Sequence, residues 1–292
     1  MSRAVHGLWL MVYGAAAAVL TVGSGACFAA EGYDFNGSAR TYLYDLKQEV
    51  SWQSAGDKLT FTSQVAWKLV IKARKVEGGK AELAATVVRV IATHRGPGSD
   101  HSFDSASGKD DELLGHLKAV EGSVLTLDVD CLTGAVAAVH GGEGIAAAVA
   151  ARAPNRADPQ APSPLAAAAA TAYSPEALRR QWDALLALPA AATSVSLGLP
   201  LTGTATRTWT GADWTLGLPA DALPMAITLV RDPTPVNGRV MTFTATGSGG
   251  AAKGWPAGGR GDLRFTLELG ALTQPVAQNH HLTWTFSDVT PR

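Results

Sequence analysis

Alternation of apolar and polar side chains is the strongest pattern in this chain, and it is clearest between residues 59 and 73. Lys, Thr and Gln share one face of that segment, whereas the other face is apolar and carries Leu59, Phe61, Val65, Trp67, Leu69 and Ile71. A period of two predicts a β-strand with one face in the core and one in water. At about 3.3 Å per residue this strand would be about 50 Å long, so we expect it to twist and curve.

The same alternation recurs on both sides of this segment and in the second half of the chain. Residues 42–52 and 81–94 alternate, with a turn at 77–80, and predict an antiparallel meander with the first strand. Further strands are expected at 124–132, 135–139, 206–216, 225–230, 240–246, 263–269 and 282–289. The polar segment 96–111 is predicted to be a loop, and the glycine-rich segments 247–250 and 258–261 to form one long hairpin loop.

Short helices are predicted among these strands. Leucines at helical spacing favour a helix over 110–120, and an Ala-rich segment favours another over 144–152. Ser174-Pro175-Glu176 is typical of a helix start, with Ser as the N-cap, Pro in the first turn and Glu near the positive end of the helix dipole. Its apolar stripe is Leu178, Trp182, Leu185 and Leu186.

The fold class expected from these elements is α+β, with long curved antiparallel sheets in a half-barrel or sandwich and a few covering helices. Residues 153–173 are rich in Pro and Ala, and prolines remove backbone donors, so we place a linker there. The predicted organisation is a signal peptide at 1–29, a β-rich half at 30–152, this linker, and a helix followed by a second β-rich half at 174–292. The two halves show a loose internal symmetry.

The first residues are typical of an export signal. Arg3 precedes an apolar run at 8–22, which is shorter than a membrane span, and small residues at Cys27 and Ala29 suit cleavage after Ala29. An uncleaved anchor and a lipoprotein with lipid on Cys27 are the alternatives. We therefore expect a periplasmic or extracellular bacterial protein whose mature chain has no transmembrane segment and a single cysteine, Cys131.

Charge and composition narrow the classes of partner. The 292 residues are 47% hydrophobic and 17% charged, which excludes a disordered chain. The formal net charge is −1, and no block of Lys or Arg occurs, so we expect no nucleic-acid partner. No pattern indicates a cofactor.

Candidate chemistry is concentrated between residues 94 and 105, where two histidines, two aspartates and three serines occur. A metal-dependent or serine hydrolase centred on His94, His101 and Asp104 is the alternative that this segment raises. The spacing matches no usual metal-ligand pattern, and no Gly-x-Ser-x-Gly elbow presents a nucleophile. We therefore favour a solvated loop in which Asp104 and Ser105 hydrogen-bond nearby backbone to shape a turn, and expect that the three residues do not converge.

Other candidates are weaker. His280 and His281 are adjacent on a predicted strand and point to opposite faces, so they are not expected to chelate one ion. Three tryptophans near predicted turns, Trp209, Trp214 and Trp255, are candidates to line a ligand pocket.

Several stretches together resemble domain-of-unknown-function family 6263, a family of exported bacterial proteins of unknown function. The stretches are Gly79-Lys80-Ala81-Glu82 with Val87-Val88-Arg89-Val90, Phe103-Asp104-Ser105, Val120-Glu121-Gly122, residues 128–139 and residues 173–186. The resemblance implies export and assigns no activity or catalytic residue.

The function that we favour from the sequence is an exported, non-catalytic binding or envelope-associated protein. Its expected partner is an apolar small molecule or a lipid, held between the curved sheet and the helices. This step is an analogy with half-barrel carriers of lipoproteins, at the level of the fold.

Overall fold

A computed structural model describes residues 32–37, 39–54, 57–109, 111–152, 163–189, 193–197, 201, 203–229, 236–252, 254–269 and 276–291. The predicted signal peptide therefore lies outside the described residues. Most of the described chain is antiparallel β-sheet, as expected. The strands are β1 (Arg40–Ser54), β2 (Asp57–Glu77), β3 (Lys80–Gly96), β4 (Ser99–Asp104), β5 (Val124–Asp130), β6 (Val136–His140), β7 (Thr193–Ser196), β8 (Thr204–Thr210), β9 (Asp213–Gly217), β10 (Met225–Leu229), β11 (Val236–Ala252), β12 (Trp255–Leu269) and β13 (Val276–Asp288).

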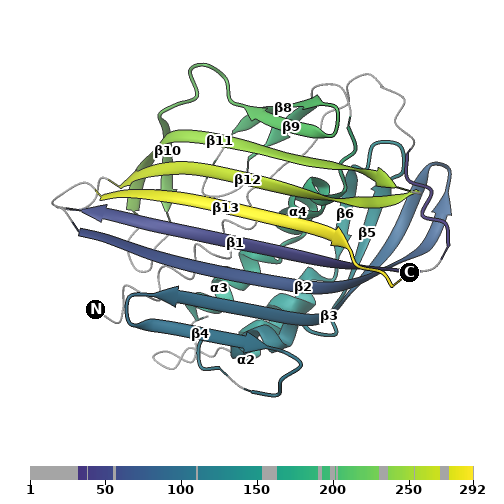
Figure 1. Ribbon diagram of the computed structural model, residues 1–292, viewed down its shortest axis with the longest axis horizontal. Coiled ribbons are helices and arrows are strands. Elements are labelled where there is room, and N and C mark those ends of the chain that lie inside the picture. Colours follow the sequence, from purple (N-terminus) through teal and green to yellow (C-terminus); the bar gives the residue numbers. More distant parts are fainter. Residues whose placement is uncertain are drawn as a thin grey trace.

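All of these strands belong to one sheet, with the order β6-β5-β3-β2-β1-β13-β12-β11-β9-β8-β7 (Figure 1). The first and last strands, β1 and β13, pair at its centre, with Leu46 opposite Trp284. Each of the long strands β3 and β11 pairs with two shorter strands along one of its edges: β3 with β5 and then β4, and β11 with β10 and then β9. Both halves of the chain thus contribute to a single sheet.

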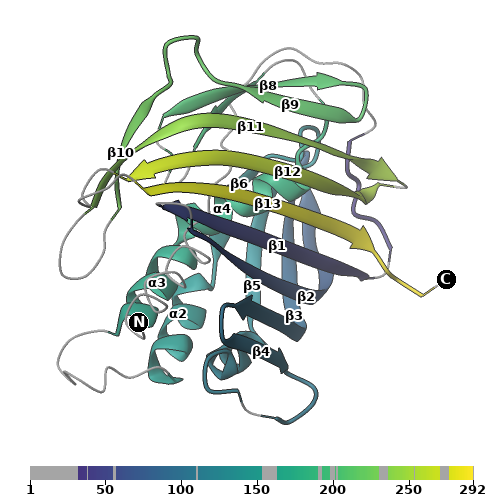
Figure 2. The ribbon, with the colours of Figure 1, turned by 60° about the vertical axis from the view of Figure 1, so that its left-hand side comes forward.

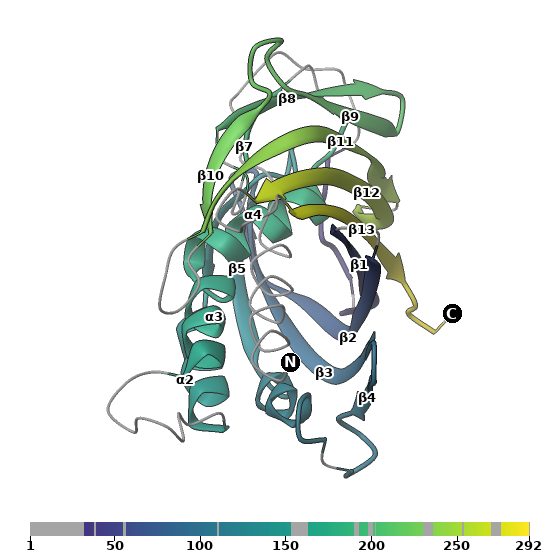
Figure 3. The same cartoon turned by 90° about the vertical axis from the view of Figure 1, so that its left-hand side faces the viewer.

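The sheet is open and strongly curved. Seen end-on, the strands from β11 to β3 follow an arc, and α4 lies on its inner side (Figure 3). We call the concave side of this arc the inner face. Alternate residues of each strand form it, and almost all are buried: on β1 it is lined by Tyr42, Tyr44, Leu46, Gln48 and Val50.

Helical elements lie on one side of the arc (Figure 2). They are the 3₁₀ helix η1 (Gly115–Val120) and the α-helices α2 (Gly142–Arg152), α3 (Pro164–Ala172) and α4 (Pro175–Leu186). Ser174 caps α4 as predicted, because its hydroxyl accepts a hydrogen bond from the Ala177 N–H at 3.3 Å. Trp182 of α4 is buried against Phe286 of β13, so this helix packs on the inner face. No helix in the described ranges has the length and apolar character that crossing a membrane requires.

Four sequence-based expectations are corrected. Within the expected linker, residues 164–172 form α3, an Ala-rich helix with Pro164 in its first turn and Ser163 as its N-cap. Residues 153–162 lie outside the described part. The expected helix over 110–120 is a 3₁₀ helix from Gly115. The expected loop at 96–111 contains β4. The glycine-rich segments are strand, since Gly247 pairs with Gly261 in the β11–β12 ladder.

Cys131 is buried, as the alternation of its segment predicts, and its thiol is free. Burial is the main cause that raises the pKa of its thiol, and the nearby Asp130 raises it further. Because the thiolate is the reactive form, we expect maleimide to label Cys131 under native conditions at least tenfold more slowly than in urea. Equal rates in the folded and unfolded protein would contradict this environment.

Candidate functional site

The residues of the candidate segment 94–105 lie on two faces of a hairpin. His94 of β3 is directly opposite His101 of β4, and both lie on the face that carries the buried Phe103. Asp104 lies on the other face, opposite the exposed Ile91. The expectation that His94, His101 and Asp104 do not converge is therefore confirmed, although the two histidines are cross-strand neighbours. The three residues of the hydrolase alternative do not form one site.

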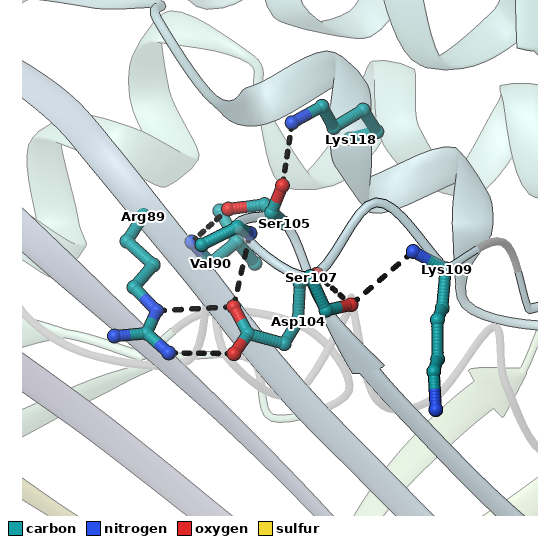
Figure 4. Close-up of polar contacts among 8 residues, drawn as sticks. Arg89, Val90, Asp104, Ser105, Ser107, Lys109 and Lys118 are labelled. Atoms are coloured by element: carbon teal, nitrogen blue, oxygen red, sulfur yellow. Dashed lines mark hydrogen bonds and ion pairs between the residues drawn. The ribbon is translucent and has the colours of Figure 1, made fainter.

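Asp104 and Ser105 hold the end of β4 against β3 (Figure 4). The Arg89 guanidinium donates two hydrogen bonds to the Asp104 carboxylate, at 3.0 and 2.6 Å. These bonds, and one from the Ala106 N–H, lower the pKa of Asp104 to about 2. The Ser105 hydroxyl accepts a hydrogen bond from the Val90 N–H at 2.9 Å. The predicted role of Asp104 and Ser105 in shaping a turn is confirmed.

The two histidines have different partners. His94 is buried, and its Nδ1 lies 2.9 Å from the hydroxyl of Ser63 on β2. Burial lowers the pKa of His94, and the neighbouring His101 lowers it further. His101 Nδ1 lies 3.2 Å from the carboxylate of Asp111, which also accepts the N–H groups of Leu113 and Leu114. Within the described ranges, His, Cys, Asp and Glu form no group of three that could hold a metal ion.

The three candidate tryptophans separate into a pair and a single residue. Trp209 and Trp214 are cross-strand partners in the β8–β9 hairpin, and Trp214 stacks on Trp284 of β13 at 6.1 Å between ring centroids. A Cβ at Gly247 would collide with the Trp214 indole, so this glycine provides the space for the ring. Trp255 instead donates its ring N–H to the Asn36 carbonyl at 2.8 Å and packs edge-on to Phe35, which places it in the packing of the N-terminal segment.

Arg207 joins the tryptophan pair and was missed in the sequence. It lies on β8 and is only 1% exposed, with the central carbon of its guanidinium 5.9 Å from the ring centroid of Trp209 and 5.4 Å from that of Trp214. Its Nε and one terminal nitrogen are buried without a hydrogen-bond partner in the described part of the chain. The sequence does carry a signal for Arg207. Threonines occupy every second position from Thr204 to Thr210, so the intervening Arg207 shares the apolar face with Ala205 and Trp209.

A second group of buried polar side chains lies on the central strands β1 and β13. Gln48, Gln278 and His280 are at most 3% exposed and face inward. Neither amide atom of Gln48 has a hydrogen-bond partner among the described residues, and the same holds for Gln278 Nε2, His280 Nδ1 and Trp52 Nε1. His280 Nε2 lies 3.2 Å from Gln278 Oε1, and its ring stacks on Phe265 at 4.5 Å. Burial lowers the pKa of His280 to about 4, so its imidazole is neutral at pH 7.

The strand register connects these groups across the inner face. Directly opposed residues of an antiparallel sheet point to the same side, so successive pairs trace a row perpendicular to the strands. One such row, which we call the cross-strand row, consists of His101, His94, Ser63, Gln48, Leu282, Leu263, Ala245, Leu216 and Arg207. It is polar on one side, apolar over four strands, and ends at the buried guanidinium.

No model of a known protein family matches the chain, and no curated protein sequence matches it significantly. Two solved structures are similar to it in backbone course. One is lipovitellin, studied for its lipid–protein interactions, with 10% identity and a TM-score of 0.40 over 89% of this chain. The other is a putative AttH protein from Nitrosomonas europaea, with 9% identity and a TM-score of 0.18 over 91% of this chain. The matched part covers 26% of lipovitellin and 57% of the second protein, and at these scores neither likeness identifies a function.

Proposed function

We propose that this protein is an exported, non-catalytic binding protein that holds an elongated, mainly apolar molecule against the inner face of its curved sheet. The observation that carries the proposal is a group of buried polar side-chain atoms on β1 and β13 without partners among the described residues; they belong to Gln48, Gln278, His280 and Trp52. They lie among buried apolar residues of the same strands and of the neighbouring β12, such as Val50, Leu282 and Phe265.

Buried polar atoms without partners destabilise the fold when no ligand is bound. A buried donor or acceptor without a partner destabilises a fold by about 1–3 kcal/mol, and native proteins contain few of them. Gln48 presents two such atoms at the centre of the sheet, where neighbouring strands already satisfy the backbone. A bound molecule with a hydrogen-bonding group supplies the missing partners, and its apolar part lies against the surrounding side chains.

Neutral hydrogen-bonding groups characterise this part of the face. Glutamine amides donate and accept, the Trp52 ring donates, and His280 is uncharged at pH 7. We therefore propose that the groups recognised there are hydroxyl, carbonyl or amide groups. The backbone hydrogen bonds between β1 and β13 lie in the plane of the sheet, whereas these side chains stand out from the inner face. They are therefore placed to meet a molecule bound on that face.

Export is the second part of the proposal, and it is supported by the apolar run and the cleavage site of the first 29 residues. N-terminal sequencing of the protein isolated from its source should find Ala30 or Glu31 as the first residue. An intact N-terminus would refute cleavage, and an acylated Cys27 would identify a lipoprotein.

Gln48→Leu tests the binding site. We expect this variant to be more stable than the wild type by about 1–3 kcal/mol in urea unfolding, because an apolar side chain of similar size removes two unsatisfied polar atoms. We also expect weaker binding of hexadecanol, measured by displacement of the uncharged fluorescent probe N-phenylnaphthylamine. Native mass spectrometry of the wild type should detect a co-purifying small molecule that is depleted in the variant.

Gln53→Leu is the matched control, since Gln53 lies on the same strand and is exposed on the outer face. It should leave both stability and hexadecanol binding close to the wild type. A Gln48→Leu protein that is strongly destabilised would show that the amide is satisfied within the fold. Absence of hexadecanol binding by the wild type would overturn the proposed site.

A further inference from the structure

We infer that Arg207 binds the anionic group of the molecule held on the inner face, so that the ligand is a long-chain acid with a carboxylate or a phosphate at one end. The inference rests on the proposed function and specifies the chemical class of its ligand. It depends on the surroundings of Arg207, on the orientation of its donors, and on the residues between Arg207 and Gln48.

The guanidinium is a buried charge without a bonded counter-ion. Within the described residues Arg207 forms no ion pair, and two of its nitrogens are buried without hydrogen bonds. The carboxylate of Asp183 on α4 acts on it electrostatically, yet Asp183 Oδ2 is also without a partner, while Oδ1 accepts the Val136 N–H at 3.0 Å. A buried charge that is not hydrogen-bonded is among the most unfavourable arrangements in a protein interior. An anion that accepts hydrogen bonds from Nε and the terminal nitrogen would supply the missing partners.

The two indoles leave the donors of Arg207 available. Guanidinium groups stack on aromatic rings through their flat face, and their N–H groups point outward in the plane. The Arg207 guanidinium lies near the faces of both Trp209 and Trp214, so the rings contribute cation–π attraction, while Nε and one terminal nitrogen have no hydrogen-bond partner among the described residues. A planar fork of N–H groups matches carboxylate or phosphate oxygens in a bidentate pair.

The cross-strand row provides the path for the apolar chain. From Arg207 it passes over Leu216, Ala245, Leu263 and Leu282 before it reaches Gln48, and all four of these residues are buried. Five strand spacings of about 4.8 Å separate Arg207 from Gln48, about 24 Å along the sheet. A head at Arg207 and a chain across β9, β11, β12 and β13 is therefore a geometry that the register itself defines.

The test compares three ligands that share a sixteen-carbon chain: palmitic acid, hexadecyl phosphate and hexadecanol. Affinities are measured on the purified, delipidated protein by displacement of N-phenylnaphthylamine at pH 8. We expect at least one of the two anionic ligands to bind about tenfold or more tightly than hexadecanol, because charge-assisted hydrogen bonds are about twice as strong as neutral ones. The stronger of the two anions identifies the head as carboxylate or phosphate.

Arg207→Met removes the charge and keeps an apolar side chain of similar length. We expect the preference for the anion to fall to within about twofold of hexadecanol. Arg239→Met, at an exposed position of β11, is the control and should keep the preference. If Arg207→Met fails to fold because the Asp183 carboxylate is then left alone, the double variant Arg207→Met/Asp183→Asn removes both charges and gives the same comparison.

The outcomes separate the inference from the proposed function. Equal affinity of the wild type for both anions and hexadecanol would overturn the role of Arg207 and leave the proposed function standing. A preference that survives in Arg207→Met, or in the double variant, would overturn it as well. A wild type that binds neither the anions nor hexadecanol would overturn both.

Discussion

Replacing Trp67 by Ala is expected to lower the free energy of unfolding by about 3–5 kcal/mol, which is usual for removal of a buried indole. Trp67 lies on the inner face of β2, where it meets Tyr44 of β1 edge-on at 6.1 Å between centroids. Its ring also stacks on Tyr173, at the end of α3, at 6.4 Å. The indole thus connects the centre of the sheet to the helices, and alanine would leave a cavity between them.

Urea unfolding of two further variants shows whether packing causes this loss. Trp67→Phe keeps an aromatic ring and removes the buried Nε1, which has no partner in the described residues, so we expect a loss below about 1.5 kcal/mol. Lys68→Ala, at the exposed neighbouring position, should change the free energy by less than about 0.5 kcal/mol. An unchanged midpoint for Trp67→Ala would mean that this face of β2 is solvated.

Local alternation predicts the strands and their faces well, because a half-buried strand imposes a period of two on its own residues. The burial of Trp67 and of Cys131 follows directly from it. Strand partners cannot be predicted in this way. The pairing of β1 with β13 joins residues more than 200 positions apart and is determined by the closure of the whole sheet. Alternation carries no information about such contacts.

The prediction of a hairpin loop from the glycine-rich segments is wrong at β11 and β12. Glycine-rich segments usually mark loops, whereas here Gly247 and Gly261 lie within paired strands and leave room for the indoles of Trp214 and Trp284. A tertiary requirement, the space for two large rings on the inner face, outweighs the local preference of glycine. The sequence signal was present only in the tryptophans of the adjacent strands, Trp214 opposite Gly247 and Trp284 opposite Gly261.

Part of the candidate site can be predicted from the sequence, because its residues are polar at positions where the alternation expects apolar side chains. Gln48 alternates in phase with Tyr42, Tyr44 and Leu46, and Arg207 in phase with Ala205. Gln278 and His280 continue the apolar face of β13, while His281 points outward to Asp262 at 2.8 Å, so the prediction that the two histidines do not share a face is confirmed. A single polar residue on an apolar strand face is common and does not by itself indicate a site. Only the register shows that Gln48 and Arg207 lie in one row.

Protonation of His280 is expected to destabilise the fold in acid. Burial lowers its pKa to about 4, against an ordinary value of 6.5 in the unfolded chain. Between these values the unfolded protein binds a proton that the folded protein does not, so stability falls as the pH drops from about 7 towards 4. The difference of about 2.5 pKa units corresponds to about 3 kcal/mol at 1.36 kcal/mol per unit.

His280→Gln isolates this contribution, because glutamine is polar and does not titrate. We expect the loss of stability between pH 7 and pH 4, measured by urea unfolding, to be smaller in the variant than in the wild type by about 3 kcal/mol. His116, whose pKa burial also lowers to about 4, contributes a similar dependence, and Asp183, with its pKa raised to about 6, an opposite one. Both remain in the variant, so they cancel in the comparison.

His281→Gln is the control for position, since His281 is the next residue of β13 and lies on the outer face. It should retain most of the wild-type pH dependence. The expected order is therefore that the His280 variant unfolds at the lowest pH, and the wild type and the His281 variant at a higher one. Parallel stability curves for the wild type and His280→Gln between pH 7 and pH 4 would show that His280 titrates in the fold as it does in the unfolded chain, and that the inner face at β13 is open to water.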